Sequence, residues 1–222
     1  MSIRKNNKYW TDRKINWITH YWNLDHPHRG MLIDILKTCK FSEVLEIGCA
    51  SGANLYNIKK EFPDVKIAGC DISKDAIDTA NVKFGEEYDN DKFNIPTIDG
   101  IAEIDFRVGG MENLPFNGMA FDMILTDACL IYSSKKNFHR VMREIRRVGS
   151  GRAQVMFLEF HHKSWFKRLA LRIMSKGRYT AYDYRKMLEK YHFKGIRIFK
   201  ISKEKWPGQP WEEYGNLILA YI

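Results

Sequence analysis

VLEIGCASGAN, residues 44–54, is the stretch that decides the fold of this chain. It joins an apolar run to two glycines with three small residues between them, and it carries a carboxylate, Glu46, inside the apolar run. Burying an unpaired charge is costly, so a strand that only fills a core has no use for Glu46. The glycines let the backbone come close to a ligand. The stretch therefore predicts a strand, a tight ligand-holding turn and the start of a helix.

Strand and helix patterns alternate along the rest of the chain. Apolar runs predict strands at 43–48, 65–70, 104–108, 121–128, 152–160, 195–202 and 216–222, and helical patterns cover 53–62, 73–84, 134–148 and 181–193. Alternating strands and helices pair in parallel through crossovers. The last two predicted strands have no helix between them, which favours an antiparallel pair. We expect an α/β fold, a Rossmann-like, open, mostly parallel seven-stranded sheet with helices on both faces and an antiparallel final strand.

Composition narrows the class of protein. A chain of 222 residues suits one domain with a small accessory segment. Its four cysteines form no CxxC pair, so a zinc site is not expected and no metal ligands are assigned. The polar N-terminus lacks an apolar signal region, and the apolar runs are too short to span a bilayer. These features predict a cytoplasmic protein without a transmembrane segment.

The formal net charge is +9, which favours acidic partners: nucleic acid, phosphorylated substrates or an anionic membrane surface. Much of the charge falls in an insertion at about 162–180, where basic and apolar residues alternate at helical spacing. This basic amphipathic helix could lie on a membrane surface or meet an RNA backbone. The plain alternative is an extra packed helix with a solvated basic face.

The first forty residues are rich in aromatic and basic side chains. Trp10, Trp17, Tyr21 and Trp22 recur at roughly helical spacing, and residues 31–36 continue as a helix. We expect residues 1–40 to form an N-terminal helical cap over the site, and residues 41–222 to form the main domain. The alternative is that these aromatic residues only pack against the sheet.

The ends of the predicted strands carry further signals. GCDIS places Asp71 at the end of the second strand, where an acid commonly binds the two hydroxyls of a ribose. A dinucleotide fingerprint, G-x-G-x-x-G/A, is only partly matched, because Ala50 replaces its middle glycine. Glu46 would also repel a pyrophosphate, whereas it would attract a ligand ammonium group. The pattern therefore argues against a dehydrogenase.

VLEIGCASG, GCDIS, VGGMENLPF and FDMILTDACLIY resemble the successive motifs of class I S-adenosylmethionine-dependent methyltransferases, over roughly residues 41–160. The resemblance implies S-adenosyl-L-methionine as cofactor, with the glycine loop at its methionine part, Asp71 at the ribose and the next motif at the adenine. It departs from the family at Ala50, where a glycine is usual, and at Gly110, where an acid often contacts the adenine. The implied cofactor-binding residues are Glu46, Gly48, Cys49, Ala50, Ser51, Gly52, Asp71, Ile72, Met111, Glu112, Thr126 and Asp127.

An alcohol acceptor also needs its proton removed by a base. His161 and His162 end the fifth strand and Tyr132 follows the fourth, so these three are the candidate catalytic residues; His26 and His28 in DHPHRG are further histidines to consider. The predicted function is O- or N-methylation of a small-molecule or glycan-type acceptor. The alternatives are a tRNA or rRNA methyltransferase that uses the basic surface, and a non-catalytic interaction protein on the same fold.

Overall fold

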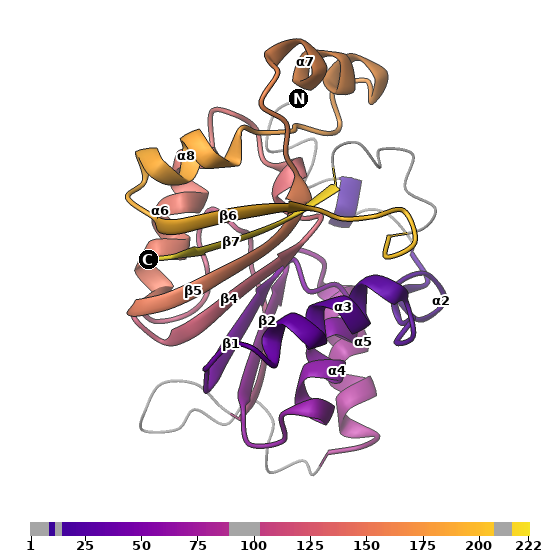
Figure 1. Cartoon of the computed structure of the whole chain (residues 1–222). Coiled ribbons are helices and arrows are strands. Elements are labelled where there is room, and N and C mark those ends of the chain that lie inside the picture. Colours follow the sequence, from indigo (N-terminus) through magenta and orange to yellow (C-terminus); the bar gives the residue numbers. More distant parts are fainter. Residues whose placement is uncertain (1–8, 12–14, 89–102, 207–214) are drawn as a thin grey trace.

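One open seven-stranded sheet organises the molecule (Figure 1). The computed structural model describes residues 9–11, 15–88, 103–206 and 215–222. Strand order across the sheet is β3-β2-β1-β4-β5-β7-β6; the first five of these pair in parallel, and β7 runs antiparallel to β5 and β6. The strands are β1 Glu43–Ile47, β2 Lys66–Asp71, β3 Ile104–Val108, β4 Phe121–Asp127, β5 Gly149–Phe160, β6 Lys194–Lys200 and β7 Gly215–Tyr221. The predicted fold class is confirmed.

Helices cover both faces of the sheet (Figure 1). One face carries α3 (Pro27–Leu36), α4 (Ala53–Glu61) and α5 (Lys74–Gly85), and the other carries α6 (Phe138–Val148) and α8 (Tyr184–Lys190). The remaining helices are α2 (Trp17–Tyr21), the short η2 (Leu130–Tyr132) and α7 (Trp165–Met174). Two hydrophobic cores result, one on each side of the sheet.

Alternate side chains of β1 pack into the two hydrophobic cores on opposite faces of the sheet. Val44 packs into the core beneath α3, α4 and α5, whereas Leu45 and Ile47 pack into the core beneath α6 and α8. This follows from the two-residue period of a strand whose faces are both covered. Every one of these three side chains is at most 1% exposed, which explains why β1 is apolar at these positions on both faces.

Three elements begin three or more residues away from their predicted starts. Helix α6 begins at Phe138, because residues 134–137 form a turn in which Ser134 O accepts from the N–H groups of Asn137 and Phe138. Strand β5 begins at Gly149, which pairs with Phe121 across a register shift. Helix α8 begins at Tyr184, after the N-cap Asp183.

The N-terminal region contains α2 and α3, as two separate helices. Parts of the predicted 1–40 cap, residues 1–8 and 12–14, lie outside the described residues. Within the described ranges, no helix has the length and apolar character that crossing a bilayer requires. The same ranges contain no group of three or more His, Cys, Asp or Glu side chains arranged to hold a metal ion. All four cysteines are free thiols.

Candidate functional site

The loop between β1 and α4 is built from left-handed backbone. Gly48, Ala50 and Gly52 have φ angles of 73°, 51° and 84°. The N–H groups of Gly48 and Cys49 both donate to Cys70 O, at 2.7 and 3.0 Å, which ties the loop to the end of β2. Left-handed φ suits glycine and disfavours alanine, so Ala50 holds a mildly strained conformation. The loop therefore presents its backbone at the carboxyl ends of the parallel strands.

A cavity of about 460 Å³ opens beside this loop. Asp71, at the end of β2, faces it and braces the loop: its Oδ2 accepts from Ala50 N at 3.1 Å and its Oδ1 accepts from Ser73 N at 2.9 Å. Burial raises the pKa of Asp71. The predicted cofactor residues that line the cavity are Glu46, Gly48, Cys49, Ala50, Asp71, Ile72, Met111, Glu112 and Asp127.

Glu46 lies at the inner wall of the cavity and is 2% exposed. Its Oε1 accepts from Asn54 Nδ2 at 2.6 Å, while its Oε2 is buried without a hydrogen-bond partner among the described residues. Burial raises the pKa of Glu46 to about 8, although the Asn54 hydrogen bond opposes this. The carboxyl of the free protein is therefore protonated at neutral pH, and a ligand that brings a donor or a positive charge to Oε2 would favour its ionised form.

Asp127 at the end of β4 joins Glu46 through the same asparagine. Asn54 Nδ2 also lies 3.1 Å from Asp127 Oδ2, and His28 Nε2 lies 2.7 Å from that oxygen. Burial raises the pKa of Asp127, but the interactions with His28, Arg29 and Asn54 outweigh it and lower the pKa to about 2. Asp127 is therefore ionised at neutral pH and accepts hydrogen bonds from both neighbours.

Two histidines extend this network toward the N-terminal segment. Nδ1 of His28 lies 2.5 Å from Nδ1 of His26, and both rings line the cavity. Arg29 secures the segment: its Nε donates to Asn23 O at 2.7 Å, its Nη2 donates to Tyr21 O at 3.2 Å and its Nη1 donates to Asn54 Oδ1. The order of the network is thus His26, His28, Asp127, Asn54 and Glu46.

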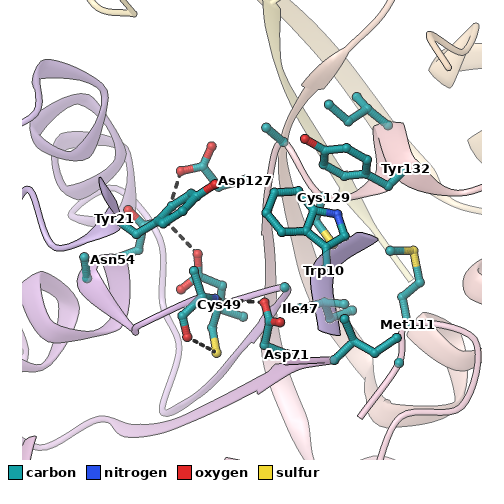
Figure 2. A pocket seen from close by; sticks show the side chains of 18 of the residues that line it. Trp10, Tyr21, Ile47, Cys49, Asn54, Asp71, Met111, Asp127, Cys129 and Tyr132 are labelled. Atoms are coloured by element: carbon teal, nitrogen blue, oxygen red, sulfur yellow. Dashed lines mark hydrogen bonds between the residues drawn. The ribbon is translucent and has the colours of Figure 1, made fainter. Parts of the chain in front are cut away.

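Aromatic side chains form part of the cavity lining, and Figure 2 labels Trp10, Tyr21 and Tyr132 among them. The Trp10 ring lies 5.1 Å from Tyr132 and 6.4 Å from Trp17, centroid to centroid, at interplanar angles of 85° and 33°. Tyr21 packs on Trp17, and Tyr179 packs on Tyr132. Trp10, Trp17 and Tyr21 precede α3, so the N-terminal segment supplies much of this aromatic lining.

Five predicted site residues lie outside the cavity lining. Ser51 Oγ donates to Trp17 O at 3.4 Å, and Gly52 forms the N-cap of α4. Thr126 Oγ1 donates to Glu159 Oε1 at 2.9 Å. The ring nitrogen Nδ1 of His161 accepts from Tyr184 N at 3.1 Å, and that of His162 accepts from Ser164 N at 3.0 Å.

Tyr132, the third candidate catalytic residue, does line the cavity. It ends the short helix η2, which Glu159 holds in place: the carboxylate accepts from the N–H groups of Cys129, Leu130 and Ile131 at 3.0, 2.8 and 3.2 Å. Burial raises the pKa of Tyr132 well above its ordinary value. The phenol is thus fully protonated at neutral pH, where it can donate a hydrogen bond but cannot remove a proton.

The raised pKa of Glu46 makes stability depend on pH. Between about 4.5, its ordinary pKa, and about 8, the folded carboxyl holds a proton that the unfolded chain has released. Stability of the free protein therefore falls as pH rises through this window, by up to about 1.4 kcal/mol per pH unit. We expect Glu46→Gln to make this decline shallower in urea unfolding at pH 5.5, 6.5 and 7.5, while Glu159, whose pKa burial also raises to about 8, keeps its own contribution. The control is Glu43→Gln at the other end of β1; a wild-type slope in Glu46→Gln would contradict the assignment.

Comparisons with known proteins point to one family. A family model described as a methyltransferase domain matches residues 44–150. Norajmaline N-methyltransferase from Rauvolfia serpentina is 25% identical over 126 residues, which are 56% of this chain and 38% of that protein. Ajmaline N-methyltransferase from the same plant is 23% identical over 121 residues, 54% of this chain and 36% of its own length. The matches thus span well under half of these curated relatives.

A solved structure matches over almost the whole chain. Geranyl diphosphate C-methyltransferase from Streptomyces coelicolor A3(2), in complex with Mg²⁺, geranyl diphosphate and S-adenosyl-L-homocysteine, superposes with a TM-score of 0.71 at 13% identity. The match covers 98% of this chain and 97% of that one, and at this identity it concerns the fold. With the motifs and the family model, this fold identifies residues 44–150 as a methyltransferase domain of the class I, S-adenosylmethionine-dependent type.

Proposed function

We propose that this protein transfers a methyl group from S-adenosyl-L-methionine to oxygen or nitrogen of a small-molecule or glycan-type acceptor. The observation that carries the proposal is the cavity of about 460 Å³, which both acidic and aromatic side chains line. Its volume falls within the range of about 300–1,000 Å³ typical of small-molecule sites. The names of the two Rauvolfia relatives, N-methyltransferases of norajmaline and ajmaline, also support a small-molecule acceptor.

The residues present fit the cofactor. When bound, S-adenosyl-L-methionine supplies a methyl group already activated on a positively charged sulfonium. The unpartnered Oε2 of Glu46 is suited to a cationic or donor group of this ligand. Asp71 is assigned to the ribose hydroxyls, and Met111 and Glu112, which line the cavity together, are assigned to the adenine.

Residues 1–40 are proposed to act as the cap of this site. Trp10, Trp17 and Tyr21 line the cavity, and Arg29 fastens their segment to α4 through Asn54. Aromatic rings over a reaction site exclude water and hold an acceptor in one orientation, which can supply about 7–11 kcal/mol of the barrier reduction. The cap therefore selects acceptors that fit beneath these rings.

The network that ends at His26 offers a general base. Ionised Asp127 can only accept, so His28 Nε2 donates to it. The Nδ1 atoms of His28 and His26 lie 2.5 Å apart, so one of them holds the proton between them, and we assign that proton to His26 Nδ1. His26 Nε2 then carries a lone pair and has no hydrogen-bond partner among the described residues. We propose that this nitrogen is the general base that removes the proton from the acceptor.

This assignment replaces the bases expected from the sequence. His161 and His162 do not line the cavity, and Tyr132 keeps its proton. Burial, His28 and Arg29 lower the pKa of His26, so its ring is neutral at pH 7 and ready to accept a proton. Tyr132, whose ring lines the cavity, is proposed instead to orient the acceptor by packing against it.

Labelled methyl transfer tests the function. Purified protein is incubated with methyl-labelled S-adenosyl-L-methionine and, separately, with a small-metabolite extract and with total tRNA and rRNA. We expect label in the small-metabolite fraction, and loss of that label with Asp71→Ala. Label in RNA, with RNA binding that collapses as salt rises, would favour the RNA alternative instead. Calorimetric binding of S-adenosyl-L-homocysteine without transfer to either pool would favour a non-catalytic interaction protein.

A further inference from the structure

Helix α7 presents large apolar side chains to solvent. Trp165 is 57% exposed, Phe166 66% and Ile173 67%, and Leu169 and Met174 are exposed as well. The part of the chain that the structure describes has eleven exposed large hydrophobic side chains, and five of them belong to this ten-residue helix. Such a concentration marks a binding surface rather than ordinary surface variation.

The apolar side chains share one face of the helix. At 100° per residue, residues 165, 166, 169 and 173 fall within an arc of roughly 100°. Leu171, the buried residue of α7, lies on the opposite side and anchors the helix to the body of the protein. The apolar face therefore points away from the body, and Figure 1 shows α7 standing apart from the other labelled helices.

The charges around this face have one sign. Residues 162–178 contain six lysines and arginines and no aspartate or glutamate. At the same angular spacing, Arg172 and Arg168 lie about 20° and about 60° beyond one edge of the apolar arc, whereas Lys167 lies about 100° beyond the other edge. Lys167 and Arg172 are exposed. An apolar face carrying Trp, Phe and Leu with basic side chains around it is the arrangement of helices that lie in a membrane interface.

We propose that α7 is an interfacial helix that docks this protein on a bilayer rich in anionic phospholipids. The basic side chains meet the headgroups, and the face of Trp165, Phe166, Leu169 and Ile173 enters the boundary with the acyl chains. An RNA backbone would use the basic side chains but would leave the apolar face in water. An anionic bilayer, unlike RNA, offers a partner for the basic side chains and for the apolar face at the same time.

Docking would also bring the cavity close to the lipid. Phe160 and Tyr179, which bracket the insertion in the sequence, both line the cavity. Thr180 N donates to Ile131 O at 2.8 Å and fixes the end of the insertion beside η2. The rim of the cavity would then face the membrane surface. The docking proposal stands apart from methyl transfer and does not depend on it.

Vesicle flotation tests the charge requirement. We expect the full chain to float with vesicles made of phosphatidylcholine and phosphatidylglycerol in equal amounts, and to remain in the bottom fraction with vesicles of phosphatidylcholine alone. Binding to the anionic vesicles should weaken as the salt concentration rises. Lys167→Glu/Arg172→Glu should lower the partition coefficient by at least about 25-fold, since each basic residue near an anionic surface contributes about fivefold. The matched control, Arg185→Glu/Lys186→Glu on α8, changes the net charge equally and should keep most of the binding.

The apolar face is tested in the same assay. Phe166→Ser/Ile173→Ser should reduce binding by at least about tenfold, whereas Met119→Ser, another highly exposed position, should not. Circular dichroism checks that each variant folds, which is expected because the altered side chains are exposed. Absence of vesicle binding, or equal losses in the α7 and α8 charge variants, would overturn the proposal. A dimer in lipid-free sedimentation that Phe166→Ser/Ile173→Ser abolishes would overturn it in favour of self-association.

Discussion

Gly48→Ala is expected to lower the affinity for S-adenosyl-L-homocysteine by at least about 100-fold and to destabilise the fold by about 2–5 kcal/mol. A Cβ at this position would lie 2.3 Å from Cys129 Sγ and 2.8 Å from Cys129 Cβ, so the turn after β4 would have to move. The left-handed backbone adds about 1–2 kcal/mol and the overpacking about 1–3 kcal/mol. Calorimetry measures the binding, and denaturant unfolding measures the stability.

Ala50→Gly is the matched control in the same loop. Ala50 already holds a φ of 51°, so glycine should relieve strain and stabilise the protein by up to about 1 kcal/mol while ligand binding is kept. The two substitutions therefore exchange the same two residue types in opposite directions. Gly48→Ala is expected to lower the free energy of unfolding, and Ala50→Gly to raise it. Tight binding by folded Gly48→Ala protein would show that the loop does not approach the ligand.

His26→Ala is expected to reduce kcat by about 10²–10⁴-fold, the usual contribution of a positioned base. Binding of S-adenosyl-L-homocysteine should change little, because the ring is assigned to the acceptor's proton and not to the cofactor. In the wild type, kcat should rise with pH through a pKa below 6.5 and then level off, since burial and the nearby positive charge of Arg29 lower the pKa of His26. The rising limb should vanish in the variant.

His20→Ala serves as control, because His20 also lines the cavity but its Nδ1 bonds to Asn16 O within its own helix turn. Its kcat and pH profile should match those of the wild type. If His26→Ala kept the wild-type kcat while His161→Ala lost it, the base expected from the sequence would be restored. That comparison separates the two assignments in a single assay.

The fold could be predicted because its determinants are local. Each buried parallel strand needs an uninterrupted apolar run, and each covering helix needs one apolar face, so both leave periodic patterns in the sequence. Ser73 reads as an N-cap and does accept from Ala76 N at 3.4 Å. Ends of elements were less predictable, because Phe121 on another strand sets the start of β5 at Gly149.

The polar network could be predicted only in part, because its contacts join distant parts of the chain. Asn54 reads as an ordinary second residue of a helix, yet it contacts Glu46 and Asp127, 73 residues away. Arg29 likewise reads as a basic helix residue, and its contact with Asn54 crosses 25 positions. The two histidines of DHPHRG can be read from the sequence as candidates, but no local pattern predicts the contact of His28 with Asp127, which lies 99 residues later.

The strand-end histidines show a second limit, which is side-chain direction. His161 follows β5 at the expected edge of the sheet, but it pairs through an isolated bridge with Tyr182 and its ring receives the Tyr184 N–H. His162 caps its own turn. Position at a strand end is readable from the sequence, whereas the direction of the side chain depends on the segment that returns against it.

The place of β7 in the sheet has a consequence for how the protein folds during synthesis. Residues 215–221 insert between β5 and β6, and β6 pairs with β7. Until the ribosome has released them, the edge of β5 lacks a neighbour from Gln154 to Phe160, and β6 has no strand to join. Phe160 at that edge borders the cavity, so a competent pocket forms late, and the nascent chain carries an open edge that invites aggregation or chaperone binding.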